Sequence, residues 1–378
     1  MKRLLFFLLL WPCLGFAAPD LATKEGLVAT CAALPADAQA LKNNAERQAF
    51  AVCSDIALLQ QIIRWFKEGM KEFNRGPNPD TLRTELRKEF TYVRDQLKKV
   101  RTLLVSLKLK PGEGLMLAPG EWQLDLDGDG SIETWERFFF AIPKRGVHPF
   151  NFNTPSNDPS YYQQQYQLDA RFKIDQSDVL WALAYHQFAE GLMEMLLAHQ
   201  LNISAKDGES IELRDSTALL RSHQLVGAGI ASSRALRRSL LAETDDKDEW
   251  IPNPHQRNTV FPMELDQQAY DTWERFLFEF SPLWAGKTLL VVEQNAGGML
   301  GEVAKRCPPG QGLNVVTLFL KPAHFPLAKD GTRSACVTVD SKHPASGLVT
   351  MLNQAVERGR ADPQSPEWHF VRYLYWVN

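Results

Sequence analysis

"QSDVLWALAYHQFAEGLMEMLLAHQL", residues 176–201, is the most strongly helical segment in the middle of the chain. Its apolar residues almost encircle a helix, and a helix that is apolar on nearly all sides is a buried one. We therefore expect residues 176–201 to form a central helix that neighbours cover on most sides. Residues 216–243 also follow a helical pattern, and their small side chains permit a neighbouring helix to approach closely.

Two further helical stretches lie upstream, within residues 21–109. In residues 46–73, apolar side chains recur at intervals of three and four, which is typical of an amphipathic helix. Residues 78–107 repeat this behaviour with alternating charges on the opposite face, and Asp80 or Thr81 is the expected helix cap. The region therefore predicts two long antiparallel helices preceded by a short one.

The pattern changes after residue 243. Short runs rich in β-branched and aromatic residues predict strands, and residues 344–359 predict a helix among them. The runs are 287–294, 314–320, 334–340 and 368–377. The expected fold is mainly α: a bundle-like helical domain over residues 18–240, followed by a smaller α+β domain over residues 241–378.

The N-terminus has the order of charged, apolar and small residues found in secretory signal peptides. Lys2 and Arg3 precede an apolar run over residues 4–16, and Gly15 and Ala17 satisfy the need for small residues before a cut. We expect residues 1–17 to be a signal peptide. No later segment looks long and apolar enough to span a membrane, so we expect no membrane insertion after cleavage.

Four cysteines remain in the exported chain, and an oxidising compartment favours disulfides. The sequence alone allows three pairings. We prefer the local ones, Cys31–Cys53 and Cys307–Cys336, because each keeps its partners in one expected domain. The destination is periplasmic or secreted, and Asn202, in an Asn-Ile-Ser acceptor sequence, leaves a eukaryotic secretory route open.

Charge and aromatic residues set limits on the partners. The net charge of −3 and the lack of a basic block argue against nucleic acid. Residues 368–376 are rich in aromatic side chains, which suit either a final core strand or a surface for a protein or carbohydrate partner. Residues 243–249 are acidic and are most simply a solvated loop, with a cation or a basic partner as the alternative.

The segment "DLDGDGSIETWE", residues 125–136, has the pattern of a calcium-binding loop. Calcium prefers six to eight oxygen ligands, and one sharply turning loop can supply them. Gly130 stands where the turn needs a residue without Cβ, and Ile132 is the apolar residue that holds the loop to the core. The expected ligands, by their spacing, are Asp125, Asp127, Asp129, Ser131, Glu133 and Glu136.

These twelve residues resemble the loop of the EF-hand family, together with the outgoing helix expected over residues 134–142. The resemblance implies Ca²⁺ as the bound ion. The segment departs from the family because Pro119 and Gly120 exclude a regular incoming helix, and because only one loop is present. Helix–loop–helix sensors usually work in pairs, so a structural ion is expected here instead of a signalling switch.

An octapeptide occurs twice with small changes. "ETWERFFF" at residues 133–140 and "DTWERFLF" at residues 271–278 agree at six of eight positions. Upstream of the second copy, Met263, Leu265 and Gln267 fall where carboxylate ligands would have to stand. If the two copies share an origin, only the first kept an ion site.

The sequence thus predicts an exported calcium-binding protein, either a binding or a scaffold protein. The alternative is an exported hydrolase, because Asp178, His186 and Glu190 fall on one stripe of the central helix. A cleft shared by the three side chains would favour the enzyme. Burial of the three apart from one another would favour the scaffold.

Overall fold

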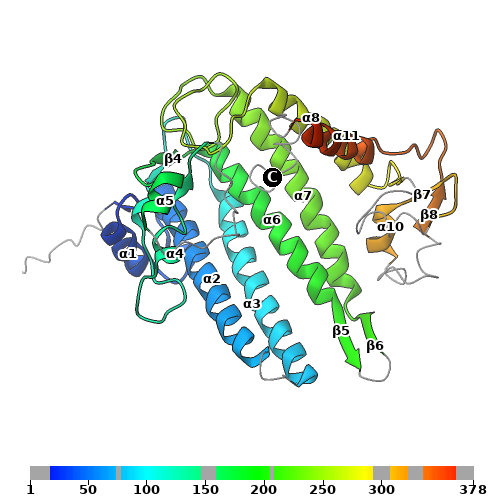
Figure 1. Ribbon diagram of the computed structural model, residues 1–378, viewed down its shortest axis with the longest axis horizontal. Coiled ribbons are helices and arrows are strands. Elements are labelled where there is room, and N and C mark those ends of the chain that lie inside the picture. The colour runs from blue at the N-terminus through cyan, green and yellow to red at the C-terminus, as the bar shows by residue number, and fades with distance from the viewer. Residues whose placement is uncertain are drawn as a thin grey trace, which may run out of the picture.

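The computed structural model describes residues 18–73, 78–145, 159–204, 208–292, 307–321 and 335–362. Over these residues the protein is mainly helical, with a few small two-stranded sheets (Figure 1). The helices are α1 (Lys24–Ala33), α2 (Asn44–Phe73), α3 (Pro79–Ser106), α4 (Thr134–Arg137), α5 (Pro159–Gln165), α6 (Gln176–Ala198), α7 (Ser216–Ala242), α8 (Gln267–Trp284), α10 (Val315–Leu320) and α11 (Leu348–Ala361), with 3₁₀ turns at Ala38–Ala40 and Pro119–Glu121.

The strands form antiparallel pairs. Strand β1 (Leu115–Leu117) pairs with β4 (Phe172–Ile174), β2 (Ile142–Pro143) with β3 (Tyr166–Gln167), β5 (His199–Ser204) with β6 (Gly208–Leu213), and β7 (Gln311–Leu313) with β8 (Cys336–Thr338). Each pair is too small to build a core of its own, because a two-stranded ribbon is marginal in water. The helices therefore supply most of the packing that holds the protein together.

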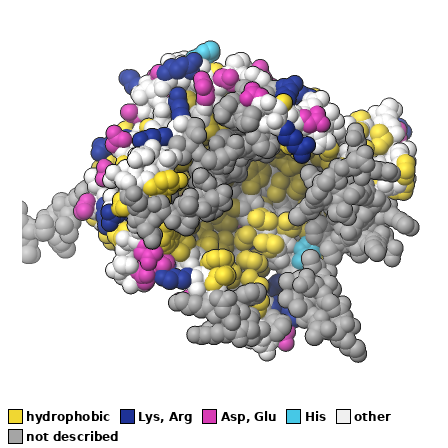
Figure 2. Space-filling model, in the orientation of Figure 1, with side chains coloured by type: hydrophobic (Ala, Val, Ile, Leu, Met, Phe, Trp, Pro, Cys, Tyr) yellow, Lys and Arg dark blue, Asp and Glu magenta, His cyan; other side chains and the backbone are white. Residues whose placement is uncertain are grey.

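Helices α2, α3, α6 and α7 lie side by side and form one layer, as Figure 1 shows. Helices α6 and α7 pack closely because glycines stand at their contact. A Cβ atom at Gly229 would lie 2.5 Å from the ring of Phe188, and one at Gly191 would lie 3.0 Å from Val226. The predicted role of small residues in α7 is confirmed. In Figure 2, hydrophobic side chains gather in a hollow at the centre of this face.

The central helix α6 is buried on several sides, as predicted, but its buried face also carries charge. Glu190 and Glu194 are 3% and 4% exposed. Arg101 Nη2 of α3 lies 3.3 Å from Glu190 Oε1, and Arg221 Nη2 of α7 lies 2.9 Å from Glu194 Oε2. Buried carboxylates need such partners, so these ion pairs fix how the two neighbouring helices meet α6.

The predicted N-terminal helices are confirmed, but the cap of α3 is not where the sequence placed it. Asn78 is the N-cap, and its side-chain oxygen accepts a hydrogen bond from Asp80 N at 2.8 Å. Pro79 then occupies the first helical position, which suits proline because that position needs no N–H donor. The cap expected at Asp80 or Thr81 is therefore wrong by two or three residues.

Both predicted disulfides are present. Cys31 joins α1 to α2 through Cys53, with 5.5 Å between the Cα atoms. Cys307 is joined to Cys336 at the start of β8, with 5.6 Å between the Cα atoms. These bridges are consistent with a protein that lies outside the cytoplasm.

The expectation that no later segment could span a membrane is wrong by length and composition. Residues Asn44–Met70 of α2 are long and apolar enough to cross one, although a single such helix is weak evidence. Part of this helix belongs to the folded core. Phe50 is buried against α3 and α6, and Cys53 is bridged to α1.

The smaller C-terminal part differs from its prediction in more than one segment. The strand predicted at residues 287–294 is not formed over its described part, where Leu289 and Leu290 make only isolated bridges. Strand β8 and helix α11 lie where the sequence placed them, but residues 314–320 form helix α10 instead of a strand. A short apolar run does not distinguish the two structures by its periodicity. Here Leu318 and Phe319 are buried against α7 and α8, which the run itself does not encode. The strand predicted at residues 368–377 lies outside the described residues.

Candidate metal centres

The loop at residues 125–136 follows a 3₁₀ turn and leads into α4. No incoming helix is present, as predicted, and Gln123 has a φ of 36°. The outgoing helix is shorter than expected, because α4 ends at Arg137 instead of continuing to Ile142. The chain turns at residues 138–140, which buries Phe138, and Ile142 then enters strand β2.

The first aspartate organises the turn through its two oxygens. Asp125 Oδ1 accepts a hydrogen bond from Gly128 N at 2.7 Å, and Asp125 Oδ2 accepts one from Gly130 N at 2.9 Å. The two glycines have φ values of 75° and 89°. Glycine adopts this left-handed region without the steric cost that a Cβ atom brings. The spacing of Asp and Gly therefore closes the loop locally.

The next two aspartates continue the turn. Asp127 Oδ1 accepts a hydrogen bond from Asp129 N at 3.1 Å, and Asp129 Oδ1 accepts from Ser131 N at 3.0 Å. The hydroxyl of Ser131 also donates to Asp129 Oδ1 at 2.7 Å, which lowers the pKa of Asp129. Asp129 is therefore held in the ionised form that a cation requires.

Glu136 closes the loop from its far end. It is 1% exposed, and its Oε1 atom accepts hydrogen bonds from Leu126 N at 2.7 Å and Asp127 N at 3.2 Å. Its Oε2 atom accepts from Glu133 N at 2.8 Å. One buried carboxylate thus joins the beginning of the loop to its end.

Three of the six predicted ligands come together. The carboxylate oxygens of Asp125, Asp127 and Glu136 lie within 4.8 Å of one another, so this group could hold a metal ion. Asp129 is not part of this group, and its Oδ2 atom lies 3.3 Å from Lys67 Nζ. Glu133 Oε2 accepts a hydrogen bond from Trp135 Nε1 at 2.8 Å. The roles of Asp129, Ser131 and Glu133 as ligands stay predictions.

Helix α2 lies against the loop, in place of the missing incoming helix. Gln60 Nε2 donates to the carbonyl oxygen of Asp125 at 2.9 Å. A Cβ atom at Gly128 would lie 3.1 Å from Arg64 Cδ. Gln60, Arg64 and Lys67 are spaced by four and three residues, so they share one face of α2. Sequence reasoning missed this contact because the two segments are far apart in the chain.

Lys67 supplies a cation to the loop from within the protein. Its Nζ atom pairs with Asp127 Oδ2 and lies 3.3 Å from Asp129 Oδ2. The hydrogen bond with Asp127 is the main cause of the raised pKa of Lys67. An ion bound between these aspartates would compete with the ammonium group for the same oxygens.

A second group of carboxylates could also hold a metal ion. The oxygens of Asp175, Glu243 and Glu249 lie within 4.8 Å of one another, where the start of α6 meets the end of α7. Asp175 caps α6, and Asp178 Oδ2 accepts a hydrogen bond from Asp175 N at 3.1 Å. Glu243 Oε1 accepts from Ser177 Oγ, whereas Glu243 Oε2 is enclosed and has no hydrogen-bond partner among the described residues.

Burial changes the protonation of the two glutamates of this group and of the neighbouring Asp178. It raises the pKa of Glu243 to about 8 and that of Glu249 to about 7, and it raises the pKa of Asp178 well above its usual range. The prediction of a solvated loop over residues 243–249 is therefore wrong for the two glutamates. It is confirmed for Asp245, Asp246 and Asp248, which are exposed.

The three residues considered for a hydrolase have separate partners. Asp178 binds the backbone of Asp175, and Glu190 pairs with Arg101 of α3. His186 Nε2 lies 3.0 Å from Asp55 Oδ1 of α2, and its Nδ1 lies 2.7 Å from the carbonyl oxygen of Ala182. Burial lowers the pKa of His186. The charge of Asp55 and the hydrogen bonds raise this pKa by more than burial lowers it, so the net shift is upward. Each group is used in packing neighbouring elements.

Comparisons with models of known protein families, with curated proteins and with solved structures found no match. The interpretation of both carboxylate groups therefore rests on their own residues and contacts.

Proposed function

We propose that this is an exported calcium-binding protein in which the loop at residues 125–136 holds one structural Ca²⁺ ion. The observation that carries the proposal is the convergence of Asp125, Asp127 and Glu136 within 4.8 Å. The proposed class is a binding or scaffold protein, because the contacts of Gln60 and Glu136 use the loop to join elements of the fold.

The chemistry of the loop favours calcium among the common metals. Its converging groups are carboxylate oxygens, which hard cations prefer, and neither histidine nor cysteine lies within residues 125–136. Calcium also tolerates the irregular geometry of a flexible loop better than magnesium, which demands a near-ideal octahedron. Outside the cell, even an affinity in the millimolar range keeps such a loop occupied.

The contacts of the loop support a structural role over a sensor role. A sensor opens a hinged pair of helices when calcium binds. Here the beginning of the loop is bonded to α2 through Gln60, and its two ends are joined through Glu136. An ion that binds only this folded arrangement stabilises the whole protein by mass action.

The test is a calcium titration of residues 18–378 monitored by calorimetry, together with thermal melting with and without calcium. We expect calcium to bind and to raise the melting temperature. Asp125→Asn removes one ligand charge while keeping the side-chain size, so it should weaken binding at least tenfold. Glu121→Gln is the matched control, because Glu121 is exposed and precedes the loop by four residues. It should leave the affinity unchanged.

Two results would contradict the proposal. One is the lack of any heat or stabilisation with calcium in a chain that is folded by circular dichroism. The other is an equal calcium response in wild type and Asp125→Asn, which would place the ion elsewhere. Release of a large apolar surface on binding would overturn the structural role and favour a sensor.

A further inference from the structure

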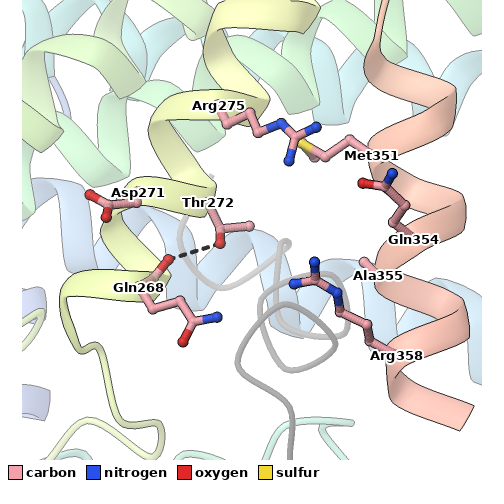
Figure 3. A pocket seen from close by; sticks show the side chains of 8 residues that line it. All are labelled: Gln268, Asp271, Thr272, Arg275, Met351, Gln354, Ala355 and Arg358. Atoms are coloured by element: carbon pink, nitrogen blue, oxygen red, sulfur yellow. Dashed lines mark hydrogen bonds between the residues drawn. The ribbon is translucent and has the colours of Figure 1, made fainter. Parts of the chain in front are cut away.

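A small pocket lies between helices α8 and α11, and none of the residues that line it belongs to either carboxylate group. It has a volume of about 170 Å³. Met351 and Ala355, which are 4% and 3% exposed, form its apolar part, and polar side chains surround them. Figure 3 shows the side chains that line it.

Two guanidinium groups from different helices point into this pocket. Arg275 extends from α8 towards α11, and Arg358 extends from α11 towards α8 (Figure 3). Arg275 forms no hydrogen bond or ion pair with any residue that the structure describes. Both side chains therefore direct guanidinium N–H donors towards one hollow, and such donors suit an anion.

The one acidic residue among these lining side chains faces away from the pocket. Asp271 points to the opposite side of α8 in Figure 3, and its Oδ1 atom accepts a hydrogen bond from Gln267 Nε2 at 2.8 Å. The other polar side chains of the lining are those of Gln268, Thr272 and Gln354. Amide groups such as that of Gln354 can donate two hydrogen bonds each. The lining is thus rich in donors.

We propose that this pocket binds the phosphate group of a small molecule. Arginine forks donate paired hydrogen bonds to phosphate oxygens, and two forks match the double charge of a phosphate or phosphomonoester. The volume is below the range of roughly 300–1,000 Å³ for sites of drug-sized ligands. The ligand is therefore a phosphate group with at most a short organic part, which would contact Met351 and Ala355.

The experiment is isothermal titration calorimetry of the full exported chain in EDTA, at constant ionic strength set with chloride. The probes are inorganic phosphate, glycerol phosphate and acetate. We expect both phosphates to bind at least tenfold more tightly than acetate, because a single carboxylate offers one charge to two arginines. Equal binding of acetate, or no heat with either phosphate, would overturn the proposal.

Variants locate the binding. Arg275→Gln and Arg358→Gln should each weaken phosphate binding at least tenfold, and Arg275→Lys should restore part of it by keeping the charge. Arg360→Gln is the matched control, because Arg360 is exposed and lies on α11 like Arg358 but does not line the pocket. If Arg360→Gln weakens binding as much as Arg275→Gln, general surface charge is responsible and the pocket is not the site.

Vesicles distinguish the source of the phosphate group. Sedimentation with phosphatidic acid vesicles, compared with phosphatidylcholine vesicles, tests whether the pocket takes a lipid headgroup. Retention on phosphatidic acid that is lost in Arg275→Gln would identify a lipid source. Binding of soluble phosphates without such retention would identify a free ligand.

Discussion

Two groups of carboxylates in this protein contain the same chemical groups and are neutralised in opposite ways. The loop cluster consists of Asp125, Asp127 and Glu136, and the buried cluster of Asp175, Glu243 and Glu249, with Asp178 beside it. Backbone N–H groups and Lys67 surround the loop cluster. Burial and repulsion between neighbouring carboxylates raise the pKa values of Asp178, Glu243 and Glu249, so protons neutralise these three groups.

This difference shows that residue type alone does not make a metal site. The loop cluster already has donors and a cation beside it, so a metal ion only has to replace Lys67. The buried cluster must release protons before it can bind a cation, and metal binding there would depend strongly on pH. The comparison can be tested by removing the donors, the protons or the lysine.

The largest expected effect is a loss of folding stability in Glu136→Ala. This substitution would leave three backbone N–H groups, those of Leu126, Asp127 and Glu133, without their acceptor. A buried unsatisfied donor costs about 1–3 kcal/mol, so we expect a loss of roughly 3 kcal/mol or more. Urea unfolding in EDTA measures this free energy without any contribution from calcium.

The control for this change is Glu121→Ala, an exposed position at which we expect a change within about 0.5 kcal/mol. If Glu136→Ala were as stable as wild type in EDTA, Glu136 would serve only as a ligand. The loop would then depend on calcium for its shape.

A smaller effect is expected from pH, acting through the buried cluster. Carboxyl groups with raised pKa values hold protons in the folded state that the unfolded chain has lost, so their stabilising contribution disappears as pH rises through the folded pKa. For Glu249 and Glu243 these values are about 7 and about 8. The melting temperature in EDTA should fall by a few degrees between pH 6 and pH 9.

Glu243→Gln should flatten this dependence, because an amide cannot ionise. His186 also has a raised pKa and adds a fall in the same direction, so the difference between wild type and Glu243→Gln isolates the cluster. Parallel pH profiles of the two proteins would show that Glu243 is ionised in the folded state. Addition of a divalent cation at pH 9 then tests whether metal can replace the lost protons.

The smallest expected effect is that of Lys67→Met, and it concerns affinity. Removing the ammonium group that pairs with Asp127 removes the competitor of calcium. We expect the calcium affinity to rise about tenfold, which corresponds to about 1.4 kcal/mol. Lys98→Met on α3 is the control, because Lys98 is exposed and distant in sequence from the loop. Unchanged affinity in Lys67→Met would mean that the ammonium group does not oppose the ion.

The repeated octapeptide shows how far local sequence determines structure. Residues 271–278 lie within the 18-residue helix α8, and Trp273 is 2% exposed. In the first copy, α4 has only four residues and ends at Arg137, before the chain turns towards β2. Nearly identical residues thus form helices of different length, because their flanking segments and packing partners differ.

The sequence by itself determined the features that depend on neighbours along the chain. The periods of α2, α3, α6, α7 and α11 were readable because apolar spacing reflects a helix face. The turn of the loop at residues 125–136 could be predicted because its aspartates and glycines form hydrogen bonds within six residues. The local disulfide pairs were also favoured correctly, since each closes a short loop.

Only the tertiary structure decided which distant side chains meet. It placed Lys67 beside Asp127, brought Glu243 and Glu249 to the cap of α6, and gave His186 and Glu190 separate partners. A local pattern specifies which face of a helix is apolar or charged, but not which element will cover that face. The protonation of a carboxylate depends on this covering, because burial and neighbouring charges set its pKa.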